Sequence, residues 1–312
     1  MRRRGRDRRR AAGRGAWLWG WLALWLGGIS LIAHGPEHEQ IAVLSEQLAR
    51  RPDDFAARLR RGELLRDHAR VGGSNELAAA RADFAWVLRK FPHHIPGNLG
   101  LARVEADAGE WTNALRRLDR VLAQSNTVAT AHLLRAQLLV KCDRPAEAVT
   151  AFDATLRLQN EPRPETFLAR ARAQLQADPA QLAPARAGLE VGLERLGPVP
   201  GLQLLALDLA TRAGDFSNAL ARLDRLAAES ERPETWLNRR GDLLLRSGDF
   251  AGARQAWAGA FTACERLPKR LRATAGVRDL ETELTAKLAR PLAPATSEPD
   301  PLPSQSVICP AP

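Results

Sequence analysis

The side chains that most often carry out chemistry are few in this sequence, and their surroundings do not suit it. His34 and His38 are four residues apart, a spacing at which two ligands of a metal ion share one helix face. Pro36 lies between them and interrupts a helix there. Asp53-Asp54 stands where a helix is expected to begin, and carboxylates at such positions cap backbone N–H groups. We therefore expect neither a metal site nor a catalytic carboxylate pair.

No recognised catalytic or phosphate-binding pattern is present: the sequence has no phosphate loop and no HExxH, CxxC, GxSxG or SxxK motif. The three cysteines, Cys142, Cys264 and Cys309, are too few and too scattered for a disulfide framework or a zinc site. The expectation is a protein that is not an enzyme, with no cofactor, no metal ion and no small-molecule substrate.

The elements that position any binding site here are pairs of helices in a repeat of about 34 residues, which extends from residue 53 to 267. In the clearest copy, residues 234–267, the first helix contains Gly241 and the turn contains Gly248. Ala253, Trp257 and Ala260 follow at helical spacing. A period of this length indicates a solenoid, in which each unit buries its apolar face against its neighbours.

Residues 95–128, 129–162 and 200–233 repeat this arrangement, with Ala114, Ala148 and Ala219 at the position of Ala253. The units resemble tetratricopeptide repeats, in which small residues let two helices cross closely and one larger residue fills the gap between pairs. The resemblance covers residues 37–267 and implies an all-α fold, a right-handed helical solenoid of about six units.

Two units depart from the pattern, and both ends of the array are distinct. An extra turn is expected at residues 71–75 and a lengthened one at 178–180. Residues 36–52 predict a lone half-unit helix, and 268–290 a single capping helix. The apolar face of this capping helix is expected to consist of Leu271, Ala275, Leu280, Leu284 and Leu288. The tail, residues 291–312, contains seven prolines and is expected to be disordered.

The net charge of +10 belongs mainly to the N-terminus, because residues 1–15 hold eight arginines and one aspartate. The repeats therefore have no basic stripe of the kind that binds nucleic acid. Residues 16–33 carry no charge and include four tryptophans, which predicts a transmembrane signal-anchor at residues 16–35. The arginine-rich segment 1–15 should then stay in the cytoplasm, and the repeats should be periplasmic, on a bacterial inner membrane.

A cleavable signal peptide remains an alternative to the anchor, because a basic segment followed by an apolar one describes both. The best cleavage pattern, Ala33-His34-Gly35, is followed by Pro36, which disfavours cleavage. A chain released by cleavage would be a secreted, soluble repeat protein.

In tetratricopeptide repeat proteins the first helix of each pair lines a concave surface, so the resemblance implies a peptide-binding groove there. At its inward positions the sequence has apolar residues and both signs of charge: Leu99, Arg103, Leu133, Gln137, Leu204, Asp208 and Asp242. The set of cations that some members use to clamp a terminal carboxylate is not reproduced.

The sequence thus favours a membrane-anchored extracytoplasmic scaffold that binds protein or peptide segments, with envelope assembly or secretion as the setting. A structural subunit that joins a larger complex through the convex face is the alternative. An accessory module of an envelope enzyme is a third possibility, and it would require an acidic or aromatic cluster in the groove.

Overall fold

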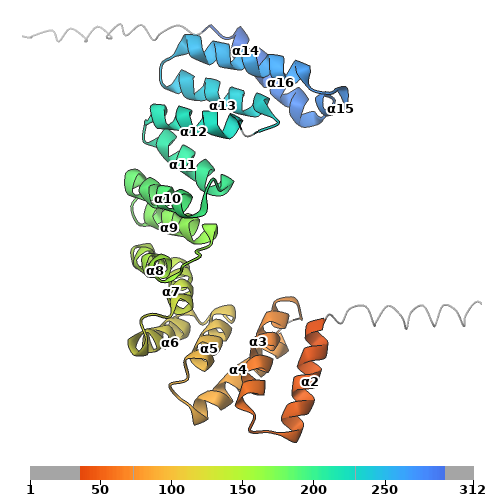
Figure 1. Ribbon diagram of the computed structural model, residues 1–312, viewed down its shortest axis with the longest axis vertical. Coiled ribbons are helices and arrows are strands. Elements are labelled where there is room, and N and C mark those ends of the chain that lie inside the picture. The colour runs from red at the N-terminus through yellow and green to blue at the C-terminus, as the bar shows by residue number, and fades with distance from the viewer. Residues whose placement is uncertain (1–35, 73, 229, 292–312) are drawn as a thin grey trace, which may run out of the picture. The chain divides into compact units, whose positions relative to one another are not determined.

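The computed structural model describes residues 36–72, 74–228 and 230–291 (Figure 1). Within these residues every regular element is a helix and no strand occurs. The prediction of an all-α solenoid of tetratricopeptide type is confirmed for this part of the chain. Two compact units, divided after Asn160, make up the chain.

The first unit consists of the half-unit helix α2 and three helix pairs. Each helix packs against the one before it in the chain. The helices are α2 (Pro36–Arg50), α3 (Phe55–Gly72), α4 (Ser74–Lys90), α5 (Ile95–Asp107), α6 (Trp111–Gln124), α7 (Ala129–Lys141) and α8 (Pro145–Leu158). The first helices of successive pairs also touch, because α5 contacts both α3 and α7.

The second unit consists of three further pairs and a terminal helix. Its helices are α9 (Pro164–Ala177), α10 (Leu182–Leu196), α11 (Pro200–Arg212), α12 (Phe216–Ala228), α13 (Pro233–Arg246), α14 (Phe250–Arg266), α15 (Lys269–Arg272) and α16 (Ala275–Ala289). Helix α16 packs on α14 and closes the core of the last pair with Val277, Leu280 and Leu284.

In four of the pairs the turn contains one residue in the left-handed region of backbone space. Gly109, Gly214 and Gly248 take φ angles of 79°, 72° and 86° at equivalent turns. Glycine adopts such angles without a steric penalty from Cβ. The pair α7–α8 has Asp143 at this place with φ 54°. Its turn therefore keeps the geometry of the others with a less suitable residue.

The helices of a pair cross closely because a small residue on one faces a large residue on the other. Ala114, Ala148, Ala219 and Ala253 are fully buried, as expected from the repeat pattern. Gly241 on α13 faces the buried ring of Trp257 on α14, and a Cβ there would overlap the indole. The ring of Phe84 on α4 is wedged in the same way between Gly62 on α3 and Gly100 on α5.

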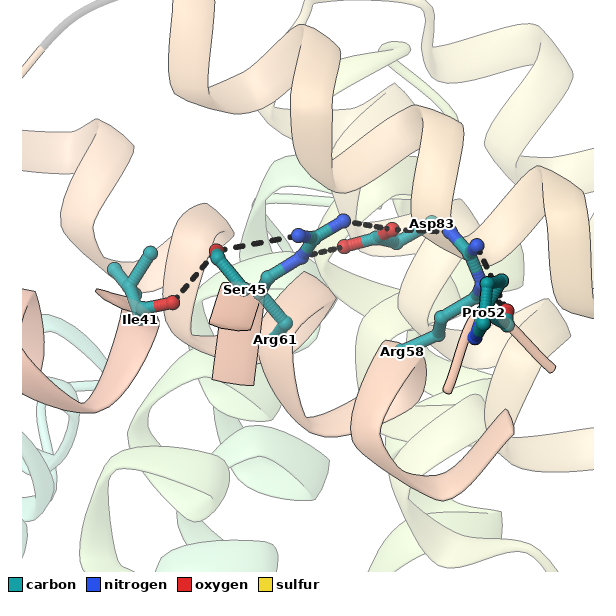
Figure 2. Close-up of polar contacts among 6 residues, drawn as sticks. All are labelled: Ile41, Ser45, Pro52, Arg58, Arg61 and Asp83. Atoms are coloured by element: carbon teal, nitrogen blue, oxygen red, sulfur yellow. Dashed lines mark hydrogen bonds and ion pairs between the residues drawn. The ribbon is translucent and has the colours of Figure 1, made fainter. Parts of the chain in front are cut away.

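A buried carboxylate joins the half-unit helix α2 to the first pair (Figure 2). Asp83 on α4 is 1% exposed and accepts two hydrogen bonds of 2.7 Å from Arg61 on α3. Arg61 also donates to Ser45 on α2 at 3.2 Å. Arg58 donates to Asp83 at 3.3 Å and to the Pro52 carbonyl at 2.9 Å. Three helices and the loop before α3 therefore depend on one charge, and removing it would leave two arginines uncompensated at a cost of about 3 kcal/mol.

Helix α3 ends at Gly72 and α4 begins at Ser74, so the boundary between them falls within residues 71–75, where the extra turn is expected. The prediction for the C-terminal end is wrong. The expected single cap helix 268–290 is broken between α15 and α16, since Thr274 has an extended backbone with ψ 147°. Leu271 and Ala275, expected on the buried face, are exposed. The break lets α16 fold back against α14. Arg272 of α15 donates a hydrogen bond of 2.8 Å to Glu281 of α16.

The predicted anchor 16–35, the basic segment 1–15 and nearly all of the tail 291–312 lie outside the described residues. Across 36–72, 74–228 and 230–291, no helix combines the length and the apolar character needed to cross a bilayer.

The close approach of α13 and α14 can be tested with Gly241→Ala. We expect the free energy of unfolding to fall by about 1–3 kcal/mol, because the added methyl group must displace the Trp257 ring. Gly276→Ala in α16 is the control, since a Cβ there meets no atom within 4 Å. It should be neutral or slightly stabilising. Chemical denaturation followed by circular dichroism measures both, and equal effects would contradict the crossing argument.

Candidate peptide-binding grooves

Each compact unit has a cavity lined mainly by the first helices of successive pairs. Groove 1, in the first unit, has a volume of about 470 Å³. It is lined by Arg66, Arg103, Ala106, Asp107, Thr130, Leu133, Leu134, Gln137, Leu138 and Lys141. Groove 2, in the second unit, has a volume of about 320 Å³. It is lined by Leu204, Leu207, Asp208, Thr211, Leu223, Arg239, Asp242, Leu243 and Arg246.

Groove 1 takes its side chains from three first helices, α3, α5 and α7. Leu133, Gln137 and Lys141 are four residues apart along α7 and so share one face. Arg103 and Asp107 have the same relation on α5. The result is an apolar floor of leucines with polar and charged groups above it, which suits a peptide that has both kinds of side chain.

The cations of groove 1 differ in their surroundings. Arg66 forms an ion pair with Asp67 and lies 3.9 Å from Asp107. The Lys141 ammonium group lies 5.9 Å from the centre of the exposed Trp111 ring at the start of α6. Such an approach is a weak cation–π attraction and leaves the hydrogen-bond donors of the ammonium group available.

Groove 2 is built on α11 and α13, and its charges are largely compensated from within the unit. Asp208 lies 3.8 Å from Arg212. Asp242 accepts hydrogen bonds from Trp257 at 3.1 Å and from Lys287 at 2.6 Å. Lys287 belongs to α16, so the terminal helix contacts a residue that lines this groove.

The ammonium group of Lys287 is held by two carboxylates. It lies 2.6 Å from both Asp242 and Glu283. Partial burial alone would lower the pKa of Lys287, but the hydrogen bonds with the two carboxylates outweigh it and raise that pKa. The same contact with Lys287 lowers the pKa of Glu283.

The structure brings six of the seven predicted groove residues into the two cavities. Arg103, Leu133 and Gln137 line groove 1, and the other three line groove 2: Leu204, Asp208 and Asp242. Leu99 differs, since it lines neither and is only 9% exposed. The reason is that Leu99 packs among the neighbouring helices, whereas Arg103 and Asp107, later on the same helix, face the groove.

Four cations of the first helices line the grooves although they were not predicted to. They are Arg66, Lys141, Arg239 and Arg246. The sequence contains a signal for two of them. Lys141 follows Trp111, and Arg246 follows Phe216, at the same separation along the chain. Each cation lies about 6 Å from the ring of its aromatic partner, at 5.9 Å and 6.0 Å.

Two arginines of second helices, Arg117 and Arg222, are part of the packing. Arg117 on α6 donates to the buried Glu105 of α5 at 2.6 Å and 3.0 Å. Arg222 on α12 is 8% exposed and pairs with Glu190 of α10. Neither residue is therefore a neutral control for a groove variant. Arg120 on α6, which is exposed, is a suitable one.

Ion pairs between consecutive repeats hold the first helices in place beside the grooves. Arg81 on α4 bonds Glu110 of the α5–α6 turn at 2.6 Å, and Arg186 on α10 bonds Asp215 of the α11–α12 turn at 2.6 Å. The bond from Arg81, aided by Asn113, lowers the pKa of Glu110. These repeated pairs set the register of one helix pair on the next.

Family models place these repeats among known ones. Residues 105–175 and residues 204–263 each match a tetratricopeptide repeat model. The chain contains tetratricopeptide repeats. No curated protein sequence matches the chain.

Several solved structures share the fold. The C-terminal part of a TPR repeat-containing protein from Cytophaga hutchinsonii is 13% identical, with a TM-score of 0.57, over 75% of this chain and 93% of that one. A tetratricopeptide repeat protein from Parabacteroides merdae is 16% identical, with a TM-score of 0.47, over 86% and 99%. YrrB, described as a TPR protein with an unusual peptide-binding site, is 14% identical, with a TM-score of 0.48, over 65% and 97%. At these identities the likeness concerns the fold alone.

Tetratricopeptide repeats form scaffolds suited to protein–protein interaction, and such proteins are generally not enzymes. Both grooves have leucines at their base and hydrogen-bonding groups beside them. This combination suits the binding of a peptide segment more than bond-breaking chemistry.

The contact between α16 and groove 2 predicts a stability change at alkaline pH. Because the folded-state pKa of Lys287 is raised above its ordinary 10.5, the folded chain keeps this proton when the unfolded chain loses it. The free energy of unfolding should therefore fall as the pH rises above 10.5 through the raised pKa. The Lys287→Met variant has no amine at this position, so its free energy of unfolding should fall less over the same pH range.

The chain suits that measurement because it has no tyrosine and only four lysines, so few other groups titrate in the same range. Denaturant titrations at several alkaline pH values would give the slope. Parallel slopes for the two proteins would contradict the assignment.

Proposed function

We propose that this chain is a membrane-anchored extracytoplasmic scaffold in which grooves 1 and 2 bind segments of partner proteins. The observation that carries the proposal is the convergence of predicted inward residues, such as Arg103, Leu133 and Gln137, on one groove in the first unit. Groove 2 repeats the arrangement in the second unit. Two grooves on one chain allow two segments to be held together.

The sequence of the N-terminus supports the membrane part of the proposal. Eight arginines precede eighteen uncharged residues that include four tryptophans. An apolar helix of that length is about 27 Å long, close to the thickness of a bilayer core. The excess of arginine favours a cytoplasmic N-terminus, which would place the repeats outside the cytoplasm. Envelope assembly or secretion is the setting we propose.

The anchor predicts a chain that keeps its N-terminus. We expect N-terminal sequencing of the membrane fraction to find residues before Ala16, because Pro36 disfavours cleavage at the best site. A reporter that is active only outside the cytoplasm, fused after Arg290, should give signal. A mature chain that starts near residue 31 or 36 would favour the secreted alternative, and a silent reporter would reverse the orientation.

The grooves predict where a partner makes contact. A photo-reactive amino acid at Gln137 or Asp208, both exposed in their grooves, should crosslink a partner protein in intact membranes. The adduct at Gln137 should be lost when Leu133→Asp places an unpaired charge on the floor of groove 1. The control position is Arg120, which is exposed on the second helix α6. A photo-reactive residue there should yield little of the same adduct.

Mass spectrometry would identify the crosslinked protein, and circular dichroism would show whether each variant remains folded. Strong crosslinks from Arg120 and none from Gln137 or Asp208 would favour a structural subunit that uses the second-helix face. The groove assignment would then be wrong.

A further inference from the structure

The two grooves differ in charge. The lining of groove 1 contains three cations, Arg66, Arg103 and Lys141, and one carboxylate, Asp107. Groove 2 contains two cations, Arg239 and Arg246, and two carboxylates. Groove 1 is therefore net positive and groove 2 is balanced, although equivalent first-helix positions build both.

The ion pairs of the lining residues show which charges stay uncompensated. Within the residues that the structure describes, neither Arg103 nor Lys141 of groove 1 has a carboxylate at ion-pair distance, whereas Arg66 is paired with Asp67. In groove 2, Asp208 and Asp242 are paired with Arg212 and Lys287, cations from outside the lining. The charges of Arg103 and Lys141 are thus available to a ligand of groove 1.

Arg66 contributes less to the attraction of a ligand. It is paired with Asp67, and its Nε is buried at 3.9 Å from Asp107. A guanidinium group without a paired carboxylate, such as that of Arg103, can bind a ligand carboxylate through two parallel hydrogen bonds, which gives the contact direction.

We propose that groove 1 selects an acidic protein segment. One apolar side chain of the segment would lie on Leu133 and Leu138, and neighbouring carboxylates would reach Arg103 and Lys141. This inference rests on the proposed function, since it assumes that groove 1 binds a peptide. Charge complementarity carries it: the lining of groove 1 has two more cations than carboxylates, and cations without a paired carboxylate attract those of a ligand.

The test uses the full chain in detergent micelles and three fluorescent peptides of equal length. Each has the same leucines, and the remaining positions are glutamate, glutamine or lysine. Fluorescence anisotropy should show the glutamate peptide binding at least about tenfold more tightly than the glutamine peptide, with the lysine peptide weakest. Added salt should reduce the difference.

Variants with opposite expected signs sharpen the test. Arg103→Gln and Lys141→Gln should each weaken binding of the glutamate peptide by up to about tenfold, with less effect on the glutamine peptide. Asp107→Asn removes the carboxylate of groove 1 and should strengthen binding of the glutamate peptide. Arg120→Gln, the same charge change on an exposed second-helix position of the same unit, should have little effect.

The outcomes separate this inference from the proposed function. If all three peptides bind equally and Leu133→Asp weakens all of them, groove 1 binds peptides but does not select acidic ones, and the inference is wrong. If no peptide binds and the Gln137 crosslink is also absent, the proposed function fails with it. An oligonucleotide that displaces the glutamate peptide as well as excess glutamate peptide does would show a general polyanion site and overturn the inference.

Discussion

The close crossing of paired helices is the constraint on which the rest of the structure depends. Ala114, Ala148, Ala219 and Ala253 are fully buried, and Gly241 lies against the ring of Trp257. Interiors are close-packed, so a single added methyl group at these points has no space to enter. Only at this spacing do the first helices of successive pairs approach enough to share a groove. The binding surface therefore depends on small buried residues that never touch a ligand.

The same packing divides the charges between the two faces of a helix pair. Arginines on second helices are used within the fold: Arg117 bonds the buried Glu105, and Arg81 reaches Glu110 in the next repeat. Arginine and lysine on first helices of the first unit, such as Arg103 and Lys141, point into groove 1 instead. Two cations without a carboxylate partner thus lie where a segment can bind, and a charge that is already paired attracts a ligand weakly.

Much of the architecture followed from periodicity. The glycines at the turns, the alanines at the crossings and the half-unit helix all come from spacing along the chain, and family models bear out the repeats at residues 105–175 and 204–263. Of the expected groove residues, Arg103 and Leu133 converge because positions one repeat apart must share a face. Leu99 does not, since its side chain is buried among the neighbouring helices. The break at Thr274 also went unpredicted, because the helical spacing of Leu271, Ala275 and Leu280 continues across it.

By itself, the sequence determined the helical class, the repeat, the location of the charge and the apolar N-terminal segment. These properties depend on the order and spacing of residues along the chain, so they can be predicted from the sequence. Only the tertiary structure decided which charges are paired. Asp242 is held by Lys287, and Asp83 by two arginines of another helix, across separations that no local pattern encodes. The physical reason is that pairing depends on distance and burial in space, where a shift of a few ångströms separates an ion pair from a free cation.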